Sequence, residues 1–231
     1  MGNYSYTGNA VLIVLCMVIG LIAGAAAERV ARRRLPELHR NYVKSDGVAV
    51  AITSAVLFGA VAWRFGLSWM LPAFLFLAVA GTVLSRIDLR HRLLPNALVF
   101  PAFLAGSILL AVAAAAQGGW ANLLLAAIGA VTMFTIYLVL AIISPRGLGM
   151  GDVKFSGVLG FYLGYLSMGS LVLGMFLGFV GGAVTGGVLV IAGFAGRKTA
   201  VPFGPSMFAG AMLTILFGEQ LGRLLLPSMF P

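Results

Sequence analysis

The chain has 231 residues, of which 61% are hydrophobic and only 9% are charged, and its mean hydropathy is +1.07. This balance excludes a soluble globular domain and is typical of a polytopic membrane protein. The net charge of +9 does not indicate nucleic-acid binding, because the basic residues are scattered at the ends of apolar segments, where they define membrane topology.

Eight apolar segments follow one another along the chain and predict an all-α polytopic membrane protein with about eight transmembrane helices. They lie at residues 10–27, 48–63, 70–85, 95–116, 121–143, 155–166, 168–195 and 203–218. The sixth is short, which predicts a tilted helix or one that merges with its neighbour near Leu166. We expect one integral-membrane domain over residues 1–231, with a short basic cytoplasmic loop at 28–47.

The first apolar segment is expected to be an uncleaved anchor with the N-terminus outside. The residues before it carry no Lys or Arg, whereas "ERVARRR" follows it, which is the reverse of a signal peptide. With eight spans, this orientation places every Lys and Arg except Arg64 and Arg223 in a cytoplasmic loop. The positive-inside rule is therefore satisfied, and the inverted orientation would violate it.

Few residues of this chain are suited to bind a metal. Cys16 is the only cysteine, and His39 and His91 are the only histidines and lie far apart in sequence. No disulfide framework or cysteine-based metal site is therefore possible, and we expect neither a metal nor a cofactor.

Glycines recur every four residues along the seventh segment, at 174, 178, 182 and 186, and Gly160 and Gly164 repeat the spacing in the sixth. Such a smooth face lets a neighbouring backbone approach closely. We expect close helix packing here rather than a substrate groove.

The six acidic residues divide into two groups: Glu28, Glu37, Asp46 and Glu219, and then Asp88 and Asp152. The first three belong to the polar loop after the first segment, where we expect them to balance its arginines, and Glu219 is expected to be solvated. Asp88 and Asp152 each adjoin the end of an apolar run, where a carboxylate is costly to keep.

Asp88 and Asp152 are separated by two complete spans, so both are expected at the cytoplasmic face and at similar depth. Two carboxylates that share one site cannot both ionise comfortably, so one keeps a proton. The charged carboxylate can take a proton from water while the protonated one donates to a carbonyl oxygen, as in aspartic proteases. We therefore predict Asp88 and Asp152 as a catalytic pair.

The stretch "GLGMGDVKF" at 147–155 supplies the candidate substrate-binding residues, namely Gly149, Met150, Gly151 and Lys154. A stretch with little side chain lets enzyme backbone approach an extended substrate and pair with it like a strand. The other interpretation is a flexible loop that ends in an N-capping Asp152, and the motif alone leaves both open. Lys154 could also tune the charge of Asp152, whereas Arg90 and Arg92 are expected to extend toward the interface.

Three stretches together resemble the type IV prepilin peptidases, membrane aspartic proteases of the Gly-x-Gly-Asp kind. "IDLRHRLLPN" (87–96) is similar to the first aspartate motif of that family, "GLGMGDVKF" to the second, and "VPFGP" (201–205) to a stretch near its last helix. The resemblance extends over nearly the whole chain. It implies that Asp88 and Asp152 are the catalytic pair and that Gly149 and Gly151 belong to the second motif.

The resemblance also implies the partners: a precursor of a pilin or pseudopilin, with a short basic leader before a hydrophobic helix, in the bilayer of a prokaryotic inner membrane. Many members of the family also methylate the new N-terminus with S-adenosylmethionine. Many of these bifunctional members have a long loop with two Cys-x-x-Cys pairs after the first helix, and they tend to carry a glutamate near the start of the second helix. The loop here is about residues 28–47 and has no cysteine, and "GVAVAITSAV" at the start of the second helix has no glutamate. We therefore predict a peptidase without the methyltransferase activity.

Three other hypotheses remain. A different Gly-x-Gly-Asp protease, of the preflagellin or presenilin-like kind, would use the same chemistry, although a presenilin-like site predicts a first aspartate deeper in a helix. An ion- or proton-coupled transporter would also place acids in the membrane, but it predicts internal repeats, and no clear repeat is present. A scaffold of a pilus machine without catalysis would not need both acids.

Overall fold

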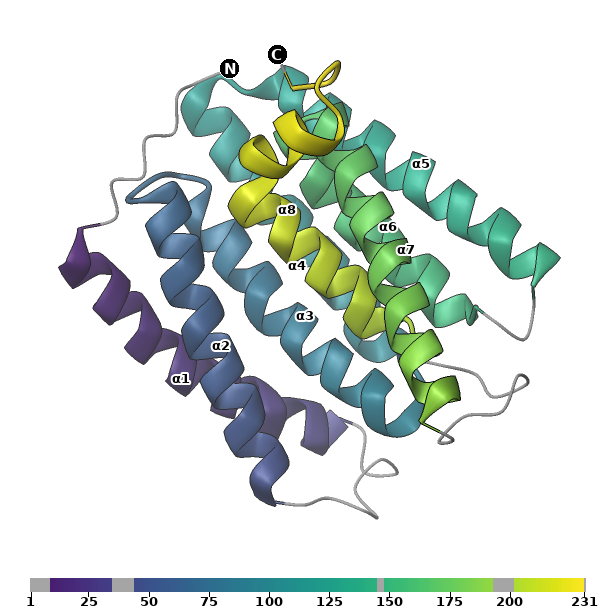
Figure 1. Cartoon of the computed structure of the whole chain (residues 1–231). Helices are drawn as coiled ribbons and strands as arrows, with labels where there is room; N and C mark the ends of the chain where they lie inside the picture. Colours follow the sequence, from purple (N-terminus) through teal and green to yellow (C-terminus); the bar gives the residue numbers. More distant parts are fainter. Residues whose placement is uncertain (1–8, 35–43, 145–147, 193–201, 231) are drawn as a thin grey trace. The chain divides into compact units, whose positions relative to one another are not determined.

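The computed structural model describes residues 9–34, 44–144, 148–192 and 202–230. Within these residues the chain forms eight α-helices and no strand (Figure 1). The helices are α1 (Ala10–Arg34), α2 (Lys44–Phe65), α3 (Leu71–His91), α4 (Asn96–Gln117), α5 (Trp120–Ile143), α6 (Met150–Leu166), α7 (Met168–Ile191) and α8 (Gly204–Leu225). The all-α prediction is confirmed.

Six of the described helices, α1 to α5 and α7, are long and apolar enough to cross a bilayer by length and composition. This agrees with the predicted polytopic membrane protein. Helix α6 has 17 residues and is buried almost without interruption from Asp152 to Tyr165, so it forms the core of its part of the structure. A count of about eight spans and an outside N-terminus stay predictions.

The chain divides into two compact units. The first comprises Met1–Arg86 and Phe100–Gly118, and the second comprises Ile87–Val99 and Gly119–Pro231. The division runs through α3 and α4, so the second unit contains the end of α3, the start of α4, and all of α5 to α8. Asp88 and Asp152 therefore belong to the same unit, and the assignment of a single domain stays a prediction.

In the first unit, α1 packs against α2 (Figure 1). Two glycines of α1 bring the backbones together, since a Cβ at Gly20 would lie 2.8 Å from the Ser54 carbonyl oxygen and one at Gly24 would lie 2.8 Å from Ser54 Oγ. Small residues at the contact allow this approach, which strengthens the van der Waals packing that membrane helices depend on.

Two acids of the first unit differ from the prediction, because Glu28 and Asp46 both lie in helices and not in the polar loop at 28–47. Glu28 is not a loop residue, because α1 continues to Arg34 and buries the Glu28 side chain. Glutamate, alanine and arginine are good helix formers, so the helix outlasts its apolar run. Asp46 lies in the first turn of α2 and forms an ion pair with Arg86 of α3. Glu37 lies outside the described residues.

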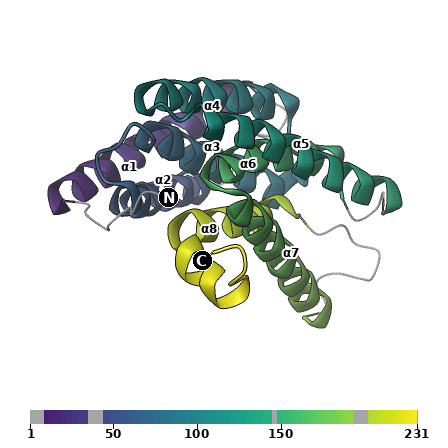
Figure 2. The ribbon, with the colours of Figure 1, turned by 90° about the horizontal axis from the view of Figure 1, so that it is seen from above.

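In the second unit, glycines bring helices α5 to α8 close to their neighbours. Gly160 of α6 lies against Gly129 of α5, where any Cβ would collide with the Gly129 carbonyl oxygen. Helices α7 and α8 lie side by side (Figure 2), and a Cβ at Gly210 would be 2.8 Å from the Gly178 Cα. A Cβ at Gly174 would be 2.6 Å from the Leu163 side chain of α6. The predicted role of the glycines in packing therefore agrees with these contacts.

Helices α6 and α7 are separate, with a break at Ser167. Its backbone is extended, with φ at −176°. The Ser167 N–H donates to the Leu163 carbonyl oxygen (3.1 Å), and the Ser170 N–H donates to Ser167 Oγ (3.0 Å). Ser167 thus ends one helix and caps the next, so the alternative of a merged sixth segment is wrong.

Candidate active site

Asp88 lies in the last turns of α3 and is buried, with 4% of its surface exposed. The Gly204 N–H, at the first residue of α8, donates to Asp88 Oδ2 at 2.9 Å. The amino end of a helix carries partial positive charge and unpaired N–H groups, so it stabilises a carboxylate there. The "VPFGP" stretch therefore contributes to the site by holding the first aspartate, and its Val201 lies outside the described residues.

Asp152 is the third residue of α6 and is also buried. Its Oδ2 accepts a hydrogen bond of 3.0 Å from the Gly149 N–H, which closes the first turn of the helix. Its Oδ1 is buried and has no hydrogen-bond partner among the described residues. One oxygen of Asp152 is therefore fixed, and the other remains available within the site.

The two carboxylates act on each other electrostatically. Asp152 is in the first turn of α6, outside the six candidate spans, and burial raises its pKa from 3.8 to about 6. The Gly149 N–H opposes this shift, and the charge of Asp88 adds to it. Near neutral pH the pair therefore holds a proton more readily than an exposed carboxyl does, which is what shared acid–base chemistry requires.

The two predicted motifs also touch directly. A Cβ at Gly151 would lie 2.7 Å from Leu94 Cβ, and Lys154 Nζ donates a 2.8 Å hydrogen bond to Asn96 Oδ1. The segment around Leu94 and Asn96 comes from the first motif, and Gly151 and Lys154 come from the second. These contacts fix the register of one motif against the other.

The four predicted substrate-binding residues have different surroundings. Met150 is exposed. At Gly149 a Cβ would have ordinary contact with Asp152 Oδ2, at 3.5 Å. Leu94 occupies the space that a side chain at Gly151 would need. Helix packing therefore requires a glycine here, whether or not substrate binds to it. Whether any of these four residues binds substrate stays a prediction.

Tyr137 of α5 was not singled out from the sequence. Its ring stacks on Phe179 of α7 with a centroid distance of 5.1 Å and lies 6.1 Å from the ring of Phe203. Its hydroxyl is buried without a hydrogen-bond partner among the described residues, and it lies within range of the Asp152 charge. The signal that the sequence offered was a phenol within a mainly apolar span.

Comparison with known proteins gives a consistent result. The model of the type IV leader peptidase family matches residues 74–191, a range that contains both aspartates. A prepilin leader peptidase/N-methyltransferase from Pseudomonas aeruginosa is 32% identical over 75% of this chain. Proteins with the same name from Stutzerimonas stutzeri and Bacillus subtilis are 32% identical over 74% and 75% of the chain.

The chain spans only part of each of these relatives: 58% of the Stutzerimonas stutzeri protein, 59% of the Pseudomonas aeruginosa protein and 66% of the Bacillus subtilis protein. No solved structure matches significantly. Because the family model covers just over half of the 231 residues, including both aspartate motifs, the chain belongs to the type IV leader peptidase family.

Proposed function

We propose that this protein is a membrane-embedded aspartic endopeptidase that removes the basic leader from type IV prepilins or pseudopilins. The single observation that carries the proposal is the pair of buried carboxylates, Asp88 and Asp152, in one unit and within electrostatic range of each other. Family membership and the names of the relatives support the substrate class.

The geometry supports different roles for the two oxygens of each carboxylate. One oxygen of each is held by a backbone N–H, from Gly204 for Asp88 and from Gly149 for Asp152. Fixed oxygens keep the carboxylates in place at little cost when the reaction begins. The remaining oxygens are the ones that would handle the water and the substrate.

In the proposed reaction, the pair shares one proton. The ionised carboxylate takes a proton from a water molecule, whose oxygen attacks the carbonyl carbon of the scissile peptide bond. The protonated carboxyl donates to the carbonyl oxygen, which gives a tetrahedral diol. Collapse of the diol breaks the C–N bond, the leaving nitrogen takes a proton, and the pair returns to its starting state.

The proposed site faces the cytoplasm. Two candidate spans, α4 and α5, separate Asp88 from Asp152, which supports a site with both aspartates on one side of the membrane. The basic residues at the end of α1, Arg32 to Arg34, favour the cytoplasmic side for that end. The basic leader of a prepilin stays in the cytoplasm, where such a site would meet it.

We restrict the proposal to peptidase activity, although the relatives' names include N-methyltransferase. The short segment between α1 and α2 has no cysteine, and the stretch that opens α2 has no glutamate. The loop cysteines and that glutamate are the features of the bifunctional members that this sequence lacks.

The test is a cleavage assay with wild type, Asp88→Asn and Asp152→Asn, each co-expressed with a tagged prepilin. Mass spectrometry of the product gives the cut site and shows whether the new N-terminus gains a methyl group. Glu219→Gln is the matched control, because Glu219 is exposed and pairs only on the surface with Arg223, at 2.9 Å. We expect cleavage in wild type and control and none in either Asn variant. Turnover that persists in both variants would rule out the aspartic mechanism.

A further inference from the structure

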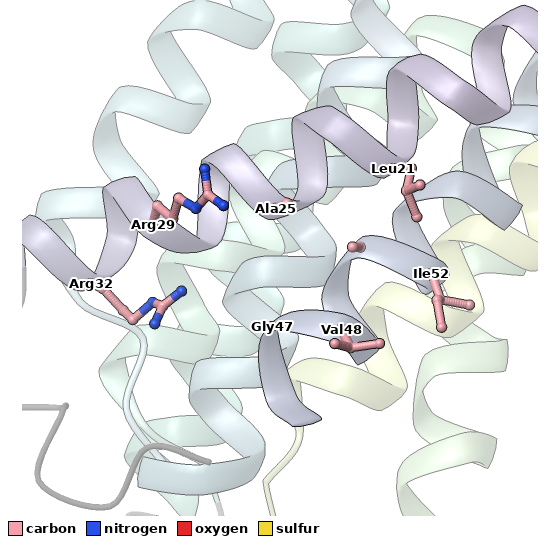
Figure 3. A pocket seen from close by; sticks show the side chains of 8 residues that line it. Leu21, Ala25, Arg29, Arg32, Gly47, Val48 and Ile52 are labelled. Carbon is pink, nitrogen blue, oxygen red and sulfur yellow. The ribbon is translucent and has the colours of Figure 1, made fainter. Parts of the chain in front are cut away.

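A groove of about 720 Å³ lies along α1 and α2 in the first unit, away from both aspartates in sequence (Figure 3). From α1 it is lined by Leu21, Ala25, Arg29 and Arg32, and from α2 by residues that include Val48 and Ile52. Figure 3 shows the two arginines at one end and Leu21 and Ile52 at the other.

The groove is a consequence of how α1 and α2 meet. The contact uses Gly20 and Gly24, which bring the helices together on one face of α1. The residues of α1 that line the groove recur at intervals of three or four, so they share the adjacent face of that helix. Tight packing beside this face leaves an open channel instead of interdigitated side chains.

The groove is apolar at one end and positively charged at the other. Leu21 and Ile52 are exposed apolar residues, and Ala25 adds a small floor between them and the arginines. At the other end Arg29 is exposed and Arg32 is half-buried, in a turn that also carries Arg33 and Arg34. An occupant that fits both ends is amphipathic, with a negatively charged head and an apolar tail.

We infer that this groove binds an anionic phospholipid, with its phosphate at Arg29 and Arg32 and an acyl chain along Leu21, Ala25 and Ile52. Guanidinium groups bind phosphate through paired hydrogen bonds. Basic residues at the cytoplasmic end of a span attract anionic lipids. A prepilin leader does not fit, because its positive charge would be repelled by the arginines. The inference is independent of the peptidase activity.

The test is lipid titration of the purified full-length protein in neutral detergent, followed by native mass spectrometry. Phosphatidylglycerol and phosphatidylcholine with identical acyl chains are compared. The variant Arg29→Gln/Arg32→Gln is compared with Arg33→Gln/Arg34→Gln, which removes the same charge from the same end of α1 but not from the groove. We expect a loss of phosphatidylglycerol affinity of about 30-fold in the first variant, since each arginine contributes roughly a factor of five. The control should lose less than about threefold.

A third variant keeps both arginines. Ala25→Trp fills the floor of the groove, and it should weaken phosphatidylglycerol binding while leaving the melting temperature near that of wild type. This variant and the comparison of the two lipids decide the question even if the double arginine variant does not fold.

Four results would overturn the inference. Equal affinity for the two lipids would mean that the groove does not recognise an anionic head group. Equal loss in both double variants would mean a general attraction to the positive charge at this end of α1. Competition by soluble glycerophosphate at the affinity of the lipid would indicate a simple phosphate site. Displacement of the lipid by a hydrophobic helical peptide would make the groove a peptide site.

Discussion

The hydrogen bond from Gly204 to Asp88 offers a direct test of the proposed chemistry, through Gly204→Ala. A Cβ at this position would lie 2.8 Å from Asp88 Oδ2, whereas ordinary contact begins at 3.4 Å, so the carboxylate must retreat by about 0.6 Å. Gly204 does not have a positive φ, so alanine can adopt its backbone conformation. The clash is with the end of a side chain, so the fold should tolerate it while the carboxylate moves.

The expected loss follows from two estimates. A hydrogen bond to a charged group contributes about 1.5–3 kcal/mol, which corresponds to roughly 10- to 150-fold in rate if it is lost in the transition state. A catalytic group misplaced by about 1 Å costs on the order of 100-fold. We therefore expect Gly204→Ala to lower kcat by about 10- to 100-fold with little change in KM.

The assay is cleavage of a tagged prepilin by purified enzyme in proteoliposomes, with kcat and KM measured separately and the melting temperature recorded. Gly187→Ala on α7 is the matched control, because a Cβ there would meet nothing within 4 Å. An unchanged kcat in Gly204→Ala would refute the role of the bond. A large fall in melting temperature would show that Gly204 supports the fold rather than the carboxylate.

Three further predictions concern the same site. Tyr137→Phe should keep the melting temperature equal or raise it by a few degrees, because the buried hydroxyl has no hydrogen-bond partner among the described residues and such a group costs about 1–3 kcal/mol, and kcat should stay near that of wild type; a fall in kcat of about 10-fold would contradict this and show that the hydroxyl acts during turnover. Gly151→Ala should lower both the melting temperature and cleavage, because its methyl group would press on Leu94; a raised KM with normal melting would instead favour substrate approach at Gly151. Burial raises the pKa of Asp152 to about 6, so the pair keeps its proton up to that pH and loses it above; kcat/KM should therefore fall on the alkaline side with a midpoint at or above 6, and a midpoint below about pH 5 in the measured pH profile would contradict the shift.

The helices could be predicted from the sequence because apolar runs bounded by charges are strong signals of membrane spans. Their ends could not. Helix α1 runs through "ERVARRR" to Arg34, because glutamate, alanine and arginine have good helix propensity. Helix α6 begins at Met150, because Asp152 accepts a hydrogen bond from the Gly149 N–H and so closes the first turn. Helix ends depend on capping and on neighbours, which hydropathy does not describe.

For the site, the sequence predicted which residues belong to it but not the contacts that they make. Counting spans between Asp88 and Asp152 was enough to expect both on one side of the membrane. The contacts around them join residues that are far apart in the sequence: the Gly204 N–H of α8 donates to Asp88, and Lys154 of α6 donates to Asn96 of α4. The stretches "VPFGP" and "IDLRHRLLPN" were singled out by their resemblance to a family, but the contacts that they make depend on tertiary packing, which the sequence does not describe.

The sequence left open whether Asp152 is a helix cap or a catalytic group. The structure shows a cap made by one oxygen, and the other oxygen is left for the proposed catalytic role. A cap needs one acceptor, and Oδ2 supplies it to the Gly149 N–H. Capping does not explain why Oδ1 is buried without a partner among the described residues, since that burial costs about 1–3 kcal/mol. The cost is reasonable if Oδ1 meets water or substrate during turnover. Asparagine keeps one acceptor for the cap but cannot exchange a proton, so Asp152→Asn should remain folded and be inactive. Loss of folding in that variant would mean that the charge itself holds α6 in place.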